Sequence, residues 1–229
     1  MAVMQIQYNE DGHRYTTFVV ARLAGWRVNS ALELAWGSQL PDEFDDLKAT
    51  HNAIEWFNGD RPRQIMRVLH SLHGSDVAKR RAGLARYVAQ MLKNGIEDWK
   101  IGVVIHAFAD SFAHTKIVDS KEVAYDAPFG HLLDGHKPDH VPLFPAKFID
   151  YVEALYACLA LRSQEEAKGA GRVVEIAHLV DFDERIKRIA SDLDYDDKAM
   201  RDVESRLKGR PTIKEVHGLL DDLESELLL

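Results

Sequence analysis

Hydrophobic residues recur at helical spacing along nearly every long segment of the chain, whereas no segment alternates apolar and polar residues in the manner of a strand. This pattern predicts an all-α protein. The expected helices span 15–24, 30–37, a segment from about 42, 76–94, 97–117, 147–166, 172–178, 181–193, 196–207 and 212–227. Frequent glycine and proline predict irregular structure over 118–145, a long loop whose histidines and aromatic residues favour a functional role.

One expected helix is apolar nearly all round, which is typical of a buried helix. This segment, IGVVIHAFADSFAHTK at 101–116, nevertheless carries His106, Asp110 and His114 at positions i, i+4 and i+8, on one stripe of the helix. Burying ionisable groups is costly unless a metal or tight polar partners compensate. A single buried histidine is usually a hydrogen-bonded core residue, but three ionisable groups on one stripe favour metal coordination.

Further candidate ligands lie in other segments of this chain, which has 11 histidines. Upstream, the candidates are His13, Asp42 and His70, with Asp45 as an additional candidate. Downstream, the segment FGHLLDGHKPDH contains His131, Asp134, His136 and Asp139. Histidine and carboxylate without thiolate suit zinc or another first-row divalent ion, and ligands from several segments indicate more than one ion. The acidic run at 42–46 is otherwise typical of a solvated face, and Asp42 follows Pro41 at an expected helix start.

The composition limits the domain organisation and the class of partner. A length of 229 residues and 46% hydrophobic residues fit one well-packed domain. We expect a metal-binding helical core over 1–170 and a more polar helical extension over 171–229 packed on the same domain. A net charge of -8 disfavours binding to duplex nucleic acid, although it does not exclude a metal-dependent nuclease. The single cysteine, Cys158, excludes an internal disulfide and a cysteine-based zinc site.

Several other chemistries lack their motifs. The chain has no G-x-S-x-G, P-loop or G-x-G-x-x-G sequence, no H-E-x-x-H, and no His-Asp dipeptide of the kind that marks the HD phosphohydrolases. No stretch approaches the roughly 18 apolar residues of a membrane span. Without a recognisable signal peptide, the protein is expected to be cytoplasmic as synthesised, with export by a non-classical route left open.

The order of these segments resembles a family of uncharacterised bacterial helical proteins (DUF6765-like), related in pattern to the zinc-dependent phospholipase C and S1/P1 nuclease superfamily. The resemblance is carried by an early histidine followed by ARLAGW…ALELAWGSQLPDEFDD, LHSLHG, GVVIHAFADSFAHTK and FGHLLDGHKPDHVP, and it covers roughly residues 10–145. It implies a helical bundle that holds zinc ions and hydrolyses phosphodiesters. The metal ligands that it implies are His13, Asp42, His70, His106, Asp110, His114 and His131.

The same resemblance implies particular roles and two departures. It implies that Asp42 handles the attacking water and that Asp110 bridges two metals. The secreted enzymes of the superfamily bind metal through an N-terminal tryptophan, whereas this chain begins Met-Ala-Val. Their late histidine motif, H-x3-E, is also replaced here by His131-Leu-Leu-Asp134 followed by His136. Two metal ions, or three with Asp134 or His136 substituting, are both open.

The leading functional hypothesis is a zinc-dependent phosphoesterase of phospholipase C type, in which a metal-activated water attacks a phosphodiester. Phospholipid is the favoured substrate because the chain is acidic, and delivery as an antibacterial toxin is one context in which such an enzyme would act. One alternative is a nuclease of the same fold. Another is a non-catalytic, metal-stabilised helical module that interacts with a protein partner not indicated by the sequence.

Overall fold

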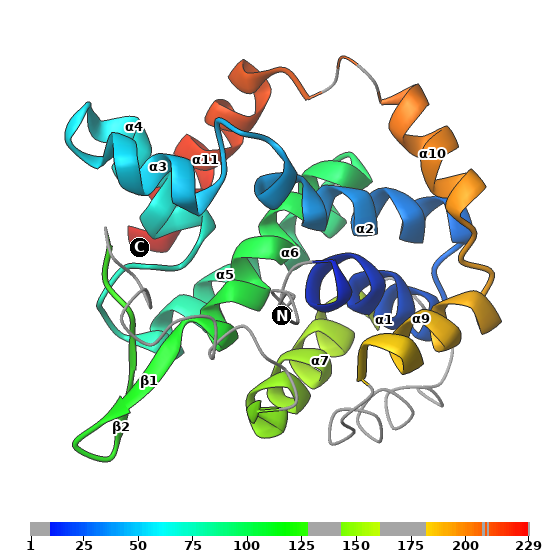
Figure 1. The fold of residues 1–229 in the computed structure, drawn as a ribbon, viewed down its shortest axis with the longest axis horizontal. Helices are drawn as coiled ribbons and strands as arrows, with labels where there is room; N and C mark the ends of the chain where they lie inside the picture. Colours follow the sequence, from blue (N-terminus) through cyan, green and yellow to red (C-terminus); the bar gives the residue numbers. More distant parts are fainter. Residues whose placement is uncertain (1–9, 128–142, 161–181, 208, 210, 229) are drawn as a thin grey trace, which may run out of the picture.

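The computed structural model describes residues 10–127, 143–160, 182–207, 209 and 211–228. Most of these residues are helical, which confirms the all-α class (Figure 1). The elements are η1 Asp11–Tyr15, α1 Thr16–Leu23, α2 Val28–Glu43, α3 Ala49–Ile54, η2 Glu55–Phe57, α4 Asp60–Gln64, η3 Ile65–Leu69, α5 Val77–Lys93, α6 Asp98–Ala113, β1 Thr115–Val118, β2 Lys121–Ala124, α7 Pro145–Ala160, α9 Phe182–Asp192, α10 Asp197–Arg206 and α11 Ile213–Leu228. Among the described residues, no helix is both long and apolar enough to cross a membrane.

Helix α6 is the central helix, with α2, α5 and α7 packed around it. Its residues from Ile101 to Ala113 are all buried, as the apolar pattern predicts. The preceding helix, α5, also has the expected ends. The Asp76 carboxylate caps its N-terminus by accepting from the backbone N–H of Lys79, and Gly95 follows its C-terminus with a φ of 66°.

Two glycines let α2 and α6 approach each other until their backbones touch. A Cβ added at Gly102 would lie 2.4 Å from the carbonyl oxygen of Leu34, and one added at Gly37 would lie 2.2 Å from the carbonyl oxygen of Trp99. Any larger residue at either position would therefore separate the helices. This close contact places the C-terminal half of α2, which contains Asp42, beside the part of α6 that carries the polar stripe.

We expect Gly102→Ala to destabilise the protein because its Cβ would collide with the backbone of α2. Forced overpacking of this kind lowers the free energy of unfolding by about 1–3 kcal/mol. Gly218→Ala in α11 is the matched control, since among the described residues nothing beyond its chain neighbours and the adjacent helix backbone lies within 4 Å of a Cβ added there. Urea denaturation measures both variants, and equal effects on stability would show that the α2–α6 contact tolerates a methyl group.

The C-terminal helices share the core of the preceding ones. Phe182 of α9, Met200 of α10 and Val216 of α11 belong to the same hydrophobic cluster as the buried side chains of α6. The apolar face of α11, which continues through Leu220 and Leu223, therefore packs on the protein's own core. The expected domain boundary near residue 170 and the expected helix over 172–178 lie outside the described residues.

The end of α2 differs from the prediction. The helix was expected to end at 37, before Pro41, and a proline often ends a helix because it lacks an N–H and restricts the preceding residue. Instead α2 continues through Pro41 to Glu43, and Leu40 in this last turn is buried in the core. Asp42 therefore lies at the C-terminal end of α2, and the prediction that it begins a helix is wrong.

The segment after α6 also differs, because α6 ends at Ala113 and a β-hairpin follows. His114 is the C-cap of the helix, and β1 pairs antiparallel with β2 in the register Thr115↔Ala124. The prediction that the helix runs to 117 and that strands are absent is therefore wrong. Asp119 and Ser120 turn the chain with φ values of 49° and 62°. Such turns usually contain Asn-Gly or Asp-Gly, so Asp-Ser gave little sequence signal.

Candidate metal centre

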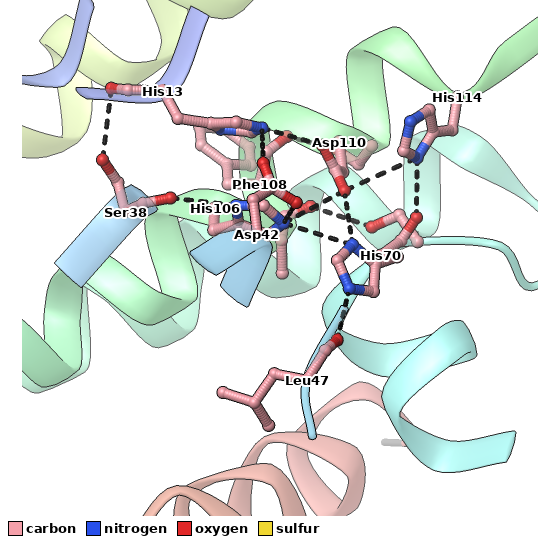
Figure 2. A network of polar contacts seen from close by, with 12 residues as sticks. His13, Ser38, Asp42, Leu47, His70, His106, Phe108, Asp110 and His114 are labelled. Carbon is pink, nitrogen blue, oxygen red and sulfur yellow. Dashed lines mark hydrogen bonds and ion pairs between the residues drawn. The ribbon is translucent and has the colours of Figure 1, made fainter. Parts of the chain in front are cut away.

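Six predicted ligand residues, from four separate parts of the chain, meet on one side of α6 (Figure 2). One comes from η1, one from the end of α2, one directly follows η3, and the other three belong to α6 and its C-cap. In this order they are His13, Asp42, His70, His106, Asp110 and His114. η1 and η3 are both π-helical turns, a rare geometry that is frequent at functional sites. Five of the six side chains are buried, and Asp42 is the most accessible, with 28% of its side chain exposed.

Backbone carbonyls fix which nitrogen of His106 and of His70 carries the hydrogen. His106 Nδ1 lies 2.9 Å from the carbonyl oxygen of Ser38, and His70 Nε2 lies 2.8 Å from that of Leu47. Because a carbonyl oxygen only accepts, each of these nitrogens is the donor. The remaining nitrogen of each neutral ring, Nε2 of His106 and Nδ1 of His70, then presents a lone pair. Metal-binding histidines are commonly held in this way.

The two lone pairs converge on one another and on a carboxylate oxygen. His106 Nε2 lies 3.3 Å from His70 Nδ1, and Asp110 Oδ2 lies 3.3 Å from the first and 3.2 Å from the second. Three acceptors this close repel unless a cation or a proton lies among them. In tetrahedral zinc coordination, with bonds of about 2.0–2.1 Å, neighbouring ligand atoms are about 3.3–3.4 Å apart. The triangle therefore has the dimensions of one face of a zinc site.

The second oxygen of Asp110 faces a wider group. Asp110 Oδ1 lies 3.3 Å from His13 Nε2, and that nitrogen lies 3.7 Å from Asp42 Oδ2. His106 borders this group as well, with its Nε2 3.9 Å from Asp42 Oδ1, and the rings of His13 and His106 stack with centroids 4.1 Å apart. Asp110 thus presents one oxygen to each of two candidate ion positions, which is the arrangement expected of a bridging carboxylate.

His114 takes a different position from the one expected of a ligand on the stripe. Its Nδ1 lies 2.8 Å from the carbonyl oxygen of His70 and 3.5 Å from Asp110 Oδ2. Figure 2 shows its other ring nitrogen turned away from Asp110. Among the described residues, His114 therefore joins neither candidate ion position and instead fixes the backbone of His70. Its assignment as a metal ligand stays a prediction.

The electrostatics of the cluster keep Asp110 ionised. Burial alone would raise the pKa of its carboxyl, but the neighbouring His114 and His106 hold that pKa well below the usual range. Burial likewise opposes the charged form of His106, yet Asp110 and Asp42 outweigh it and raise the pKa of His106. Burial and the nearby His106 lower the pKa of His13, which favours the neutral ring that a metal requires.

Of the other candidate residues, Asp45 is the one that lies in the described part of the chain. Asp45 is exposed and forms an ion pair of 2.6 Å with Lys48, so it does not reach the cluster. The loop candidates fall in 128–142, outside the described residues, and they are His131, Asp134, His136 and Asp139. Sequence reasoning missed the backbone carbonyls that orient the histidine rings. It also missed Ser71, whose hydroxyl donates to the carbonyl of Ala107 at 2.8 Å and ties the His70 turn to α6.

Comparisons with models of protein families, with curated proteins and with solved structures find no match. The relationship to the phospholipase C and P1 nuclease enzymes therefore stays a prediction. The geometry gives the cluster a defined chemical capacity: three imidazole nitrogens and two carboxylates, without thiolate, are a donor set that zinc and similar divalent ions accept.

We expect zinc affinity to fall as the pH is lowered from about 8 to about 5.5, because His106 must lose its proton to bind metal. Its raised pKa makes proton competition begin at a higher pH than for an ordinary histidine. Each proton displaced per ion weakens binding about tenfold per pH unit below the pKa. Competition with a chromophoric chelator measures this dependence, and an affinity independent of pH would argue against histidine ligation.

Proposed function

We propose that this protein is a metal-dependent phosphoesterase whose described residues hold two divalent ions, zinc being the favoured metal. One position is bounded by His70, His106 and Asp110. The other lies among His13, Asp42 and His106, with the second oxygen of Asp110 3.3 Å from His13 Nε2. The observation that carries the proposal is the triangle formed by two ring nitrogens and a carboxylate oxygen, with sides of 3.2, 3.3 and 3.3 Å, on a carboxylate whose other oxygen faces a third histidine, His13.

The residues of the cluster would have different roles in such a reaction. Divalent ions bound there would lower the pKa of a water to about 7 and stabilise charge on a phosphoryl group. Asp42 is the most exposed member of the cluster, and its carboxylate can accept a proton from a water that enters from solvent. The carbonyls of Ser38 and Leu47 hold the rings of His106 and His70 in the tautomers that leave the inner nitrogens unprotonated.

Phosphodiesters are the favoured substrate class for two reasons. Paired ions suit in-line displacement at phosphorus because each can contact one of the two oxygens involved. The segments that carry the ligands also resemble the phospholipase C and P1 nuclease pattern. Within that class, the net charge of -8 favours a phospholipid over a nucleic acid.

A structural metal site is the second candidate, and the burial of the cluster favours it. His13, His70, His106 and Asp110 are each at most 2% exposed. Structural zinc sites are closed to solvent by protein ligands, whereas catalytic sites keep a position for water or substrate. The partial exposure of Asp42 is the feature that distinguishes the catalytic proposal from this alternative.

We expect Asp42→Asn to remove most of the hydrolytic activity, by about 100-fold or more, because an amide cannot serve as the general base. Zinc-loaded protein is assayed on phosphatidylcholine dispersions, single-stranded DNA and a chromogenic phosphodiester, with bound zinc measured in each sample. Asp45→Asn is the matched control, since it makes the same change at an exposed carboxylate outside the cluster. Bound zinc with no turnover of any of these substrates would reject the enzyme and leave the structural site.

A further inference from the structure

Two short protrusions expose large apolar side chains to solvent. The first protrusion, called the knob, contains the end of α3 and η2. Its tip consists of Ile54 and Phe57, at the ends of α3 and η2, and each is 80% exposed. The hairpin tip consists of Ile117 and Val118 in β1, which are 67% and 43% exposed. In Figure 1 the knob, in cyan, and the hairpin, in green, extend from the same end of the molecule. Exposed apolar groups gathered in this way mark interaction surfaces.

A small hydrophobic cluster joins the two protrusions beneath their tips. Trp56 of η2 packs with Tyr125, which follows β2, and with Met66 and Leu72. The hairpin is also anchored to α5, because Arg81 forms an ion pair of 2.7 Å with the carboxylate of Glu122, the residue that pairs with Ile117. The two tips are therefore presented by connected parts of the fold, each held away from the main core.

Cationic side chains accompany both tips. Exposed Lys116 and Lys121 flank the hairpin tip, and the Lys116 ammonium lies over the ring of Tyr125 at 4.9 Å. Exposed Arg67 lies over the ring of Trp56 at 5.3 Å. Within the described part of the chain, these three side chains form no ion pair. Three carboxylates oppose this charge: Asp119 in the hairpin turn, Glu55 between the two knob-tip residues, and Asp60 on the knob. Glu55 accepts a hydrogen bond from Asn58, and Asp60 is paired with Arg63 at 3.5 Å. Unpaired positive charge next to exposed apolar residues is notable in a chain whose net charge is -8.

This combination fits the surface of a lipid bilayer better than a single protein groove. Apolar side chains can enter the boundary between headgroups and acyl chains while the long lysine and arginine side chains remain among the phosphates. A membrane accepts two separated points of contact because it is broad and deformable. Basic residues next to such contacts favour anionic lipids, each contributing about 1 kcal/mol near the surface.

We infer that the knob tip and the hairpin tip together bind the surface of a phospholipid membrane that contains anionic lipids. The inference goes beyond the proposed function and uses none of the metal ligands. The proposed membrane-binding surface and the metal centre are connected through η3, since Arg67 lies within η3 and His70 directly follows η3. Membrane binding through these tips would bring a phosphodiester headgroup to this end of the molecule. From here the chain continues through η3 to His70 of the metal centre.

Vesicle flotation tests the inference without depending on catalysis. Protein carrying Asp42→Asn, the substitution expected to suppress any turnover, is mixed with vesicles of phosphatidylcholine alone or with added phosphatidylglycerol. We expect binding to the mixed vesicles, with about a tenfold or greater loss in Ile54→Ser/Phe57→Ser and in Ile117→Ser/Val118→Ser. Lys116→Gln/Lys121→Gln should lose about tenfold or more on anionic vesicles only.

Leu143→Ser is the matched control, because Leu143 is 56% exposed and belongs to neither tip. Absence of binding to both kinds of vesicle would overturn the inference, as would equal losses in the control and the tip variants. Equal binding to neutral and anionic vesicles would overturn its electrostatic part. A dimer in gel filtration that the tip substitutions dissociate, without vesicle binding, would instead assign the surface to a second copy of the chain. Failure of the phosphoesterase proposal leaves all these readouts intact.

Discussion

We expect Asp110→Asn to abolish metal binding at the proposed site and, with it, the proposed phosphodiester hydrolysis. The side chain is buried, and its two carboxylate oxygens face His70 and His106 on one side and His13 on the other. An amide has nearly the same shape but no charge and only one oxygen, so neither ion position keeps its full donor set. We expect metal affinity to fall by about 100-fold or more, which exceeds the usual effect of changing a residue that only supports a ligand.

Elemental analysis of the purified protein, together with the phosphodiester assay, measures this effect. Asp45→Asn makes the same chemical change at an exposed carboxylate and is expected to keep wild-type metal content and activity. Circular dichroism establishes that both variants are folded. If Asp110→Asn retained the wild-type metal content, the bridging role of this carboxylate would be wrong.

Removal of the metal is expected to lower the melting temperature by about 10 °C or more. A ligand present at about 1,000 times its dissociation constant stabilises the folded state by about 4 kcal/mol, and each kcal/mol shifts the melting temperature of a protein of this size by about 2–4 °C. Without an ion, the lone pairs of His70 and His106 and the Asp110 carboxylate oxygen must share a proton or repel one another. Thermal melts with a chelator, and after zinc is added back, measure the shift.

Two histidine variants control for effects unrelated to the site. His106→Ala should melt at a low temperature that neither chelator nor zinc changes, because one ligand of the triangle is missing. His51→Ala, at an exposed histidine of α3, should respond to chelator as the wild type does. A wild-type protein whose melting temperature is unaffected by chelator and by zinc would show that a proton, rather than a metal, holds the cluster together.

Local sequence signals predicted the parts of the fold that local interactions determine. Asp76 and Gly95 mark the ends of α5 because capping and a left-handed backbone depend on adjacent residues. The apolar surroundings of His106 and Asp110 likewise identified α6 as a buried helix with a polar stripe. The other histidines and Asp42 were named as partners of this stripe from the sequence. Their approach to it depends on tertiary packing, which no local signal describes.

The remaining features depend on contacts that a sequence pattern does not contain. The helix α2 continues past Pro41, and the close approach of Gly37 and Gly102 places its C-terminal half, with Asp42, beside α6. The hairpin after His114 has its apolar residues facing solvent, so it shows no alternating pattern with a buried side. Backbone carbonyls orient His70 and His106, and any residue can supply a carbonyl, so side-chain identity gave no indication of them.

Anomalous X-ray diffraction at the zinc absorption edge, on crystals of zinc-loaded protein, tests the metal centre most directly. Two anomalous peaks are predicted beside the Asp110 carboxylate, one bounded by His70 and His106 and the other by His13 and Asp42. The bond lengths to the nitrogen ligands should be about 2.0–2.1 Å. Crystals that show hydrogen bonds among these side chains and no anomalous density between them would contradict the account.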